Sequence, residues 1–422
     1  MNVISELCKD IIIPKLVKVR QEFVKEYIDI EDIPEAVNKE MVRLKEFIKP
    51  GMRIAVTSGS RGIRNIEVIT KAIVDCLKEQ DAKPFIVAAM GSHGGATAEG
   101  QKMILTGYGI TEAYLNCPVI SSMETVSIGK TEDGQDVQID RYAAEADGII
   151  VCGRIKAHTS FRGSYESGLM KMLTVGLGKQ HGADIFHAAG LENLASRLPI
   201  FGNAVLKYAK IIGGLGIIDN AYDKTYKIKV LLKEEIPLIE PKLLQESKDI
   251  MGRLWFDEAD VILVDQIGKD ISGDGMDSNI IGKYPSPILK GGIKSQHVVV
   301  LDLTDSSHGN ANGIGLASIT TKRLVDKIDV DVTYPNAITS NAVWAVKIPL
   351  YAKTDKEAIQ LAIRTCTNID KDKVRIIRIK NTLEIENIYI SEALVDEAKK
   401  NPNIYIEGNP EEWGFDKYGN LF

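Results

Sequence analysis

The chain alternates short apolar segments with glycine-containing loops and amphipathic helices, and this alternation restricts its fold more than any other feature. Arg53 to Thr57 is predicted to be a short strand, followed by a helix from about Asn65 to Gln80. A second apolar strand, Pro84 to Met90, enters a Gly-Ser-His-Gly-Gly loop, and helical spacing resumes over Ala96 to Leu105. Short apolar strands, each followed by a loop and a helix, are typical of a parallel sheet. The chain is therefore predicted to be an α/β protein.

A second α/β pattern follows a polar, proline-containing stretch in the middle of the chain. Val261 to Val264 is expected to be a strand, and Ile314 to Ile328 a helix. The sequence predicts two α/β domains facing a central cleft. Residues 1–240 would form the N-terminal domain and residues 241–422 the C-terminal domain that closes the substrate cleft. In open α/β sheets ligands bind at the carboxyl ends of the strands, so functional residues are expected in the loops that follow strands.

Composition excludes several classes of function. The 422 residues include 52 Lys and Arg and 58 Asp and Glu, for a net charge of -6, and the basic residues gather in no one stretch. This balance argues against nucleic acid or an anionic membrane as the main partner. With no signal peptide and no apolar run of the roughly 18 residues that span a bilayer, a cytoplasmic protein is expected. Five scattered cysteines, never spaced as CxxC, argue against disulfides, structural zinc and iron–sulfur clusters.

Two histidines directly follow predicted strands. His93 stands in the Gly-Ser-His-Gly-Gly loop, and His158 follows the apolar strand Gly148 to Gly153. Neutral imidazole is the natural general base at physiological pH, so two histidines facing one cavity would form a candidate acid–base site. A histidine at a strand end can also be a structural or helix-capping residue, and the sequence alone leaves both interpretations open.

Lys171 stands alone in the apolar run Leu169-Met-Lys-Met-Leu173. Buried lysines are rare unless they are paired or functional, although the stem of an exposed lysine can also lie along apolar surface. His181 and His187 follow on a predicted helix, six residues apart, and hence not on one face. At most one of these two histidines is expected to point where Lys171 points.

In order, residue type and spacing, these motifs resemble the nickel-dependent lactate racemase family. The cofactor of that family is a nickel-pincer nucleotide, a nicotinic-acid-derived mononucleotide that is tethered to a lysine. The resemblance runs from about residue 53 to residue 269. It implies that Arg61, in Ser58-Gly-Ser-Arg-Gly62, binds the substrate carboxylate, although Ser58 and Gly62 stand where the family has aspartate and proline.

The resemblance also implies roles for the other candidate residues. His93 and His158 match the two catalytic histidines, and Lys171 matches the lysine that carries the cofactor. His187 is preferred to His181 as the nickel ligand, because the 16-position interval from Lys171 suits the family. In the second half of the chain, Gln266-Ile-Gly-Lys269 matches the family's Gln-x-x-Lys, which implies that Gln266 and Lys269 bind substrate.

The activity that the resemblance implies is racemisation or epimerisation of a small 2-hydroxy acid. The hydrogen on C2 is barely acidic beside an ionised carboxylate, so hydride transfer to a cofactor avoids a carbanion. Inversion then needs two bases on opposite faces of a planar 2-oxo acid, which accounts for a histidine pair. The expected partners are the hydroxy acid and, transiently, the proteins that make the cofactor.

Two alternatives from other functional classes remain at this stage. His93, His158 and His187 could form a three-histidine zinc site of a hydrolase or lyase, which would leave Lys171 without a role. A non-catalytic protein that binds anionic metabolites could use the same basic residues without any need for a histidine pair. The side chain of the substrate is not determined, because family members act on lactate, on longer or dicarboxylic hydroxy acids, or on sugar acids.

Overall fold

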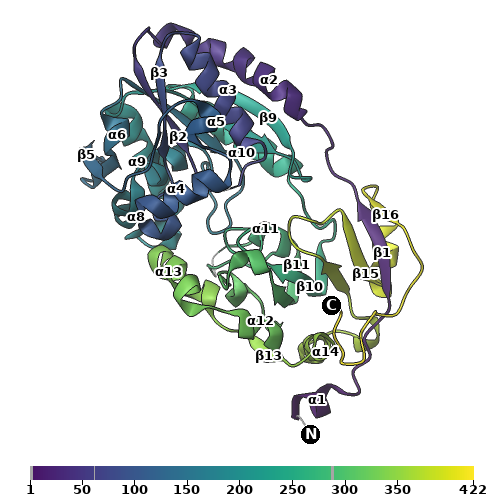
Figure 1. Ribbon diagram of the computed structural model, residues 1–422. Helices are drawn as coiled ribbons and strands as arrows, with labels where there is room; N and C mark the ends of the chain where they lie inside the picture. The colour runs from purple at the N-terminus through teal and green to yellow at the C-terminus, as the bar shows by residue number, and fades with distance from the viewer. Residues whose placement is uncertain (1–2, 61, 287–288) are drawn as a thin grey trace. The chain divides into compact units, whose positions relative to one another are not determined.

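The computed structural model describes residues 3–60, 62–286 and 289–422, and it forms two compact α/β units (Figure 1). One unit, here called the histidine unit, comprises residues 25–251. The other, here called the terminal unit, combines the chain up to Val24 with residues 252–422. This division differs from the expected boundary between residues 240 and 241, because the start of the chain joins the second unit and the helix after residue 235 stays with the first.

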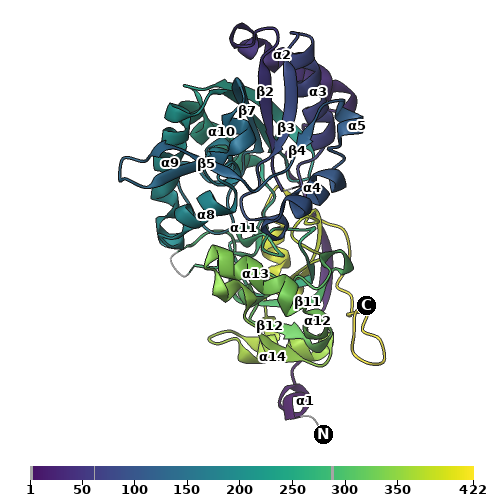
Figure 2. The same cartoon turned by 60° about the vertical axis from the view of Figure 1, so that its left-hand side comes forward.

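The histidine unit is built on a six-stranded sheet. Its strands, in spatial order, are β4 (Val119–Ile120), β3 (Lys83–Ala88), β2 (Arg53–Ser58), β7 (Gly148–Arg154), β8 (Ile211–Asp219) and β9 (Thr225–Leu232). All neighbouring pairs are parallel except β8 and β9, which are antiparallel. Figure 2 shows β3, β2 and β7 side by side, so their carboxyl ends lie along one edge of the sheet. The parallel α/β pattern expected from the sequence is confirmed.

Helices cover both faces of this sheet. The helices of the unit are α2 (Ile33–Met41), α3 (Ile66–Lys78), α4 (Ala98–Gly107), α5 (Glu112–Leu115), α6 (Arg141–Ala144), α7 (Leu169–Lys171), α8 (Lys179–His187), α9 (Leu194–Tyr208) and α10 (Ile236–Ile250). Successive strand residues face opposite sides of a sheet. Accordingly, Gly213 of β8 faces Leu44, on the side where α2 and α3 pack, whereas Gly214 faces Leu169 of α7. A separate antiparallel hairpin is formed by β5 (Thr125–Lys130) and β6 (Asp136–Asp140).

The terminal unit is built on an eight-stranded mixed sheet. Its strands, in spatial order, are β13 (Leu350–Ala352), β12 (Ile319–Thr321), β11 (Lys294–Leu303), β10 (Glu258–Ile267), β14 (Ile376–Ile379), β15 (Asn387–Ser391), β1 (Leu16–Gln21) and β16 (Ile404–Ile406). Its helices are α1 (Val3–Cys8), α11 (Ser278–Ile281), α12 (Lys322–Lys327), α13 (Val330–Ser340), α14 (Asp355–Thr365) and α15 (Val395–Ala398). The first strand, β1, pairs antiparallel with β15 and β16, and this pairing assigns the start of the chain to the terminal unit.

One predicted element of the terminal unit was wrong. The helix expected over Ile314 to Ile328 is interrupted by β12, and only the short helix α12 follows it. Two successive threonines at the end of β12 donate side-chain hydrogen bonds to the neighbouring strand: Thr320 to the carbonyl of Val300 (2.8 Å) and Thr321 to that of Leu301 (2.6 Å). Pairing with β11 therefore overrides the local helical spacing, since β-branched residues suit a strand.

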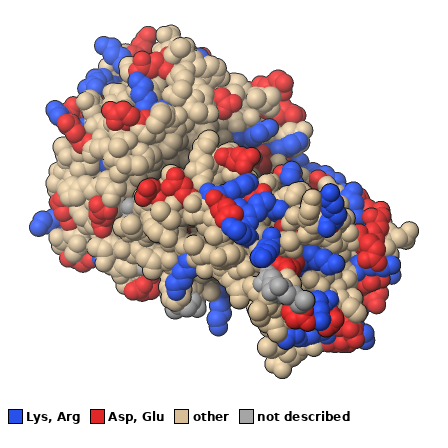
Figure 3. Space-filling view, turned by 60° about the horizontal axis from the view of Figure 1, so that its bottom comes forward, with Lys and Arg blue, Asp and Glu red and all other residues tan. Residues whose placement is uncertain are grey.

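Charged side chains of both signs lie on the surface (Figure 3), and the cysteines lie inside. On the face shown in Figure 3, Lys and Arg side chains are interspersed with Asp and Glu side chains. Among the described residues, no helix combines the length and the apolar character needed to cross a membrane. All five cysteines are buried as free thiols.

The loop that carries His93 packs closely against the first turn of α4. A Cβ placed on Gly100 would lie 1.9 Å from the carbonyl oxygen of Gly94 and 2.8 Å from Thr97 Oγ1. Gly94 itself has a φ of +66°, a left-handed conformation that favours glycine. Because the obstructing atom is backbone, a side chain at Gly100 cannot be accommodated by a rotamer change.

We expect Gly100→Ala to lower the free energy of unfolding by roughly 1–3 kcal/mol, the usual cost of overpacking. Gly107→Ala, in the same helix, is the matched control, because no atom lies within 4 Å of the added Cβ. This control should be neutral or stabilise by roughly 0.5–1 kcal/mol, since alanine loses less entropy in a helix. Urea unfolding of both variants measures the difference, and equal stability of the two would contradict the packing argument.

Candidate active site

Three loops meet at the edge formed by the carboxyl ends of β3, β2 and β7. Because β2 lies between the other two strands, the residues that follow it stand between those that follow β3 and β7. Ser60 follows β2, His93 follows β3 and His158 follows β7. Two histidines from separate predicted motifs thus follow β3 and β7, the two strands that flank β2. Arg61, predicted to bind the substrate carboxylate, lies outside the described residues.

His93 is held through its side chain and through its loop. Ser60 Oγ and His93 Nδ1 are hydrogen bonded, and Tyr108 Oη donates to the carbonyl of Ser60 (2.8 Å). The buried amide of Gln101 donates through Nε2 to the carbonyls of Gly91 (2.9 Å) and His93 (3.2 Å). The loop is therefore shaped by α4, which carries Gln101, rather than by its own glycines alone.

His158 is held by the loop that follows β7. Its backbone N–H donates to Glu166 Oε2 (2.7 Å), and its Nδ1 accepts from the backbone N–H of Ser160 (2.9 Å). The imidazole stacks on the ring of Phe161, with a centroid separation of 4.3 Å. The fully buried carboxylate of Glu166 also accepts from Lys248 Nζ of α10 (2.7 Å), which offsets the cost of burying its charge. Glu166 thus connects the His158 loop to α10, which is distant in sequence.

Lys171 reaches the same edge from the end of α7. Its Nζ contacts His158 Nε2 directly, and it lies 6.0 Å from the centroid of the Phe161 ring. The helical turn that follows is irregular, since the N–H of Leu177 donates to the carbonyl of Met172, five residues earlier (2.9 Å). Such wide turns occur often at functional sites. Lys171 is partly exposed.

His187 and His181 occupy different environments on α8. His187 is largely buried, and its Nδ1 has no hydrogen-bond partner among the described residues. Burial lowers the pKa of His187 to about 4, and a positive charge on Lys171 would act in the same direction. His181 is exposed instead, with its Nδ1 beside Thr125 Oγ1 (3.3 Å). His187 is thus a largely buried, neutral imidazole, whereas His181 lies on the exposed side of the helix.

Gln266 and Lys269 belong to the terminal unit, at and just after the end of β10. The backbone N–H of Lys269 donates to Ser307 Oγ (2.8 Å), and its Nζ donates to the carbonyl of Gly273 (2.6 Å). The expected position after a strand is thus observed for Lys269. Its role and that of Gln266 in substrate binding stay predictions.

Sequence reasoning missed two buried ionisable residues that support this edge. Lys179 is fully buried at the start of α8, where its Nζ lies 3.0 Å from Asp140 Oδ2 and also donates to the carbonyl of Ala88. Glu240 of α10 accepts from the N–H of Met170 (3.0 Å), in the first turn of the helix that ends with Lys171. A lysine among glycines and a glutamate in a polar helix carry no local signal of burial, so no pattern could have identified them.

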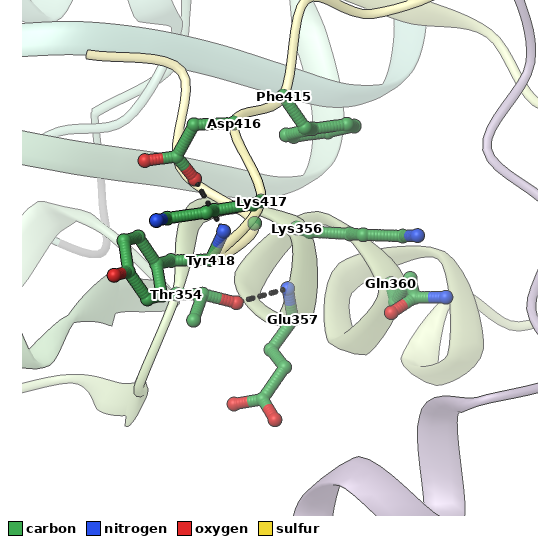
Figure 4. Close-up of a pocket in the computed structure, with 9 residues that line it drawn as sticks. Thr354, Lys356, Glu357, Gln360, Phe415, Asp416, Lys417 and Tyr418 are labelled. Carbon is green, nitrogen blue, oxygen red and sulfur yellow. Dashed lines mark hydrogen bonds between the residues drawn. The ribbon is translucent and has the colours of Figure 1, made fainter.

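A pocket of about 310 Å³ lies elsewhere, in the terminal unit, between the start of α14 and the C-terminal segment (Figure 4). Its polar groups serve local structure: Thr354 Oγ1 caps α14 by accepting from the N–H of Glu357 (3.2 Å), and the carboxylate of Asp416 accepts from the N–H of Tyr418 (2.8 Å). The pocket contains none of the residues that the sequence singled out. It is lined by Thr354, Lys356, Glu357, Gln360, Phe415, Asp416, Lys417, Tyr418 and Gly419.

The fold and the site together define a class: an α/β protein with a histidine–lysine site at the carboxyl edge of a parallel sheet. Residues 14–197 match the family model of the lactate racemase N-terminal domain. This range contains His93, His158, Lys171 and His187. This part of the chain is therefore similar to the lactate racemase N-terminal domain, and the resemblance found in the sequence is confirmed over this range.

Solved structures show the same fold. The lactate racemase apoprotein from Thermoanaerobacterium thermosaccharolyticum is similar with a TM-score of 0.51 and 14% identity, over 88% of this chain and 99% of that one. A Thermotoga maritima protein solved in a structural genomics programme has a TM-score of 0.53 and 12% identity, over 85% of this chain and 97% of that one. At these identities the likeness establishes the fold alone. Among curated proteins, none gives a significant match.

The buried carboxyl group of Glu240 makes stability depend on pH. Burial raises the pKa of Glu240 from its ordinary value of 4.5 to about 8 in the folded protein. Between these two values the folded protein therefore binds one proton more than the unfolded chain. The contribution of Glu240 is fully present below pH 4.5 and is lost as the pH rises toward 8.

We expect Glu240→Gln to make the free energy of unfolding decline less steeply than in the parent protein between pH 5.5 and 7.5. The difference in slope is at most about 1.4 kcal/mol per pH unit, the value for one proton. Urea unfolding at several pH values measures it. The exposed Glu234→Gln should keep the parental slope, and an unchanged slope in Glu240→Gln would contradict the assignment.

Proposed function

We propose that this chain is a racemase or epimerase of a 2-hydroxy acid that works with a nickel-pincer nucleotide tethered to Lys171. The observation that carries the proposal is the direct contact between Lys171 Nζ and His158 Nε2, at the same sheet edge as His93. All three residues lie within the part of the chain that matches the lactate racemase domain. A lysine and two histidines at one strand edge supply a tether and two acid–base groups.

The residues present fit such a cofactor. His187 is a buried imidazole, its pKa of about 4 keeps it neutral, and its Nδ1 lacks a hydrogen-bond partner among the described residues. A metal ligand must be deprotonated, and neutral imidazole suits nickel. Within the described part of the chain, no three His, Cys, Asp or Glu side chains are grouped so as to hold a metal. A metal bound through His187 would therefore need donors from outside the protein, which a pincer nucleotide brings as a carbon and two sulfur atoms.

The histidines have separate tasks in the proposed reaction. When bound, the nucleotide supplies an acceptor for the hydride from C2 of the substrate. One histidine takes the hydroxyl proton as the planar 2-oxo acid forms, and the other gives a proton to the carbonyl oxygen as inversion at C2 is completed. Ser60 orients His93 through Nδ1. For His158 to act as a base at Nε2, its Nδ1 must carry a hydrogen, which requires its contact with the Ser160 N–H to open.

The two alternative functions have weaker support. A three-histidine zinc site would require His93, His158 and His187 to converge, and no such group is found among the residues that the structure describes. A metabolite-binding protein has no need for the contact between Lys171 and His158. The metabolite-binding function predicts that hydroxy acids bind without being converted. A chiral assay of substrate inversion distinguishes this outcome from racemase activity.

We expect protein made together with the cofactor-synthesis enzymes to carry a nucleotide-sized mass adduct on Lys171. His187→Ala should keep this adduct but lose nickel, because the tether and the metal ligand are different residues. Intact mass, peptide mapping and metal analysis measure the three quantities. His181→Ala, changed on the exposed face of the same helix, should keep both adduct and nickel. An adduct on Lys179, or nickel retained in His187→Ala, would contradict the assignment.

We expect substrate labelled with deuterium at C2 to keep its label through inversion, because the hydrogen that leaves C2 as hydride returns to C2. In heavy water, unlabelled substrate should gain little deuterium at C2, since the histidines exchange only the hydroxyl proton. His93→Ala and His158→Ala should each lower kcat by about 10²- to 10⁴-fold in both directions, the usual contribution of a positioned acid or base. Mass spectrometry and NMR of the product follow the label. Rapid incorporation of solvent deuterium at C2 would contradict hydride transfer even if inversion were observed.

A further inference from the structure

The two ring nitrogens of His158 have different partners, and these partners determine where its hydrogen lies. The backbone N–H of Ser160 donates to Nδ1 at 2.9 Å. An amide N–H is always a donor, so Nδ1 must offer a lone pair. A neutral imidazole carries one hydrogen, and with Nδ1 as the acceptor that hydrogen resides on Nε2. An imidazolium ion would place N–H groups on both nitrogens and oppose the Ser160 N–H.

The Nε2–H group of His158 faces the amine of Lys171. Nζ of Lys171 lies within hydrogen-bonding distance of Nε2. A lysine ammonium has three donors and no acceptor, so an ammonium here would set N–H against N–H. A neutral amine has a lone pair and accepts the hydrogen from Nε2. The pair of contacts made by His158 is therefore satisfied only when Lys171 is uncharged.

The surroundings agree with an uncharged amine. The ring of Phe161 stacks on the imidazole, and its centroid lies 6.0 Å from Lys171 Nζ, at the limit of a cation–π contact. His187, the nearby histidine of α8, is neutral because burial lowers its pKa to about 4.

The charged groups of the adjoining loop and of α10 bind one another. Glu166 accepts from Lys248 Nζ at 2.7 Å, and Arg162 lies 3.5 Å from the same carboxylate. Arg162 also donates to the carbonyl of His158. The carboxylate on this side is thus already surrounded by two cations and by the N–H of His158.

We propose that His158 holds Lys171 as a neutral amine in the cofactor-free protein and thereby makes it a better nucleophile than an exposed lysine toward carboxyl and thiocarboxyl carbons. The inference deepens the proposed function, on which its biological meaning rests: the chain would prepare its own lysine for covalent attachment. His158 then has two successive roles, as positioning residue for Lys171 before attachment and as acid or base afterwards, when the acylated nitrogen no longer accepts from Nε2.

The test uses N-hydroxysuccinimidyl acetate at pH 7 on full-length protein made without the cofactor pathway. The lone pair of Nζ attacks the acetyl carbon, an N–C bond forms, the C–O bond breaks and N-hydroxysuccinimide anion leaves, while one Nζ proton passes to water. An ordinary lysine releases its proton near pH 10.4, so roughly one in 2,500 is neutral at pH 7. We expect Lys171 to be acetylated at least about tenfold faster than the exposed Lys102, by peptide mapping of a time course.

A matched pair of variants tests the part played by His158. Ser160→Pro removes the N–H that holds Nδ1 as an acceptor, whereas Ser160→Ala keeps it. Ser160→Pro should lower the acetylation rate of Lys171 toward that of Lys102 and shift its pH profile to more alkaline values. Ser160→Ala should leave both unchanged. His158→Phe keeps an aromatic ring on Phe161 but removes the Nε2–H, and it should behave like Ser160→Pro, which guards against a folding defect in the proline variant.

Two results would overturn the inference: acetylation of Lys171 no faster than that of Lys102, or equal rates in Ser160→Pro, His158→Phe and Ser160→Ala. Because neither probe nor protein contains the nucleotide, this outcome is independent of the proposed function. Fast acetylation without any adduct after co-expression would refute the tether and leave the neutral amine standing. An adduct on Lys171 together with slow acetylation would refute only the inference drawn here.

Discussion

The arrangement of the histidine unit depends on the close packing of one irregular turn, Met172–Gly176, against the ends of neighbouring strands. A Cβ on Gly153, in β7, would lie 2.8 Å from Met172 Cγ, and a Cβ on Gly176 would lie 2.9 Å from the carbonyl oxygen of Ala89. Only glycine leaves room for this approach. Because Lys171 immediately precedes the turn, the same packing brings its amine to the strand edge where the histidines stand. Side chains at these glycines would separate the lysine from His158.

Buried charges hold the supports of the site together. Taking a charge out of water is costly, and it is offset only when good partners replace the water. Lys179 meets this condition with Asp140 and the carbonyl of Ala88, and burial lowers the pKa of this lysine. The hydrogen bond from Lys179 to Ala88 joins the start of α8, which carries His187, to the end of β3, which leads to His93. Removing one partner would leave the other charge buried and unpaired, which is costly. The contacts of Lys179 therefore fix the position of α8 relative to the end of β3.

Periodicity predicted β2, β3 and β7 because each is a short apolar run that a glycine loop ends. It did not predict β8, over Ile211–Asp219, because three glycines dilute its apolar pattern. Those glycines are required by packing: a Cβ on Gly213 would lie 2.5 Å from the carbonyl oxygen of Leu231 in the adjacent strand. Nor did it predict that β1 belongs to the terminal unit, because its partners β15 and β16 lie at the other end of the chain. Pairing between distant segments leaves no local trace.

The sequence by itself determined which kinds of side chain reach the edge of the sheet. His93 and His158 follow apolar strands, and Lys171 interrupts an apolar run; these are local patterns, readable without a structure. Only the tertiary structure decided the tautomers and protonation states of the histidines. The tautomer of His158 depends on the Ser160 N–H, and the neutrality of His187 depends on burial, whereas His181 on the same helix is exposed. Hydrogen-bond partners and solvent exclusion arise from segments brought together by folding, and protonation follows from them.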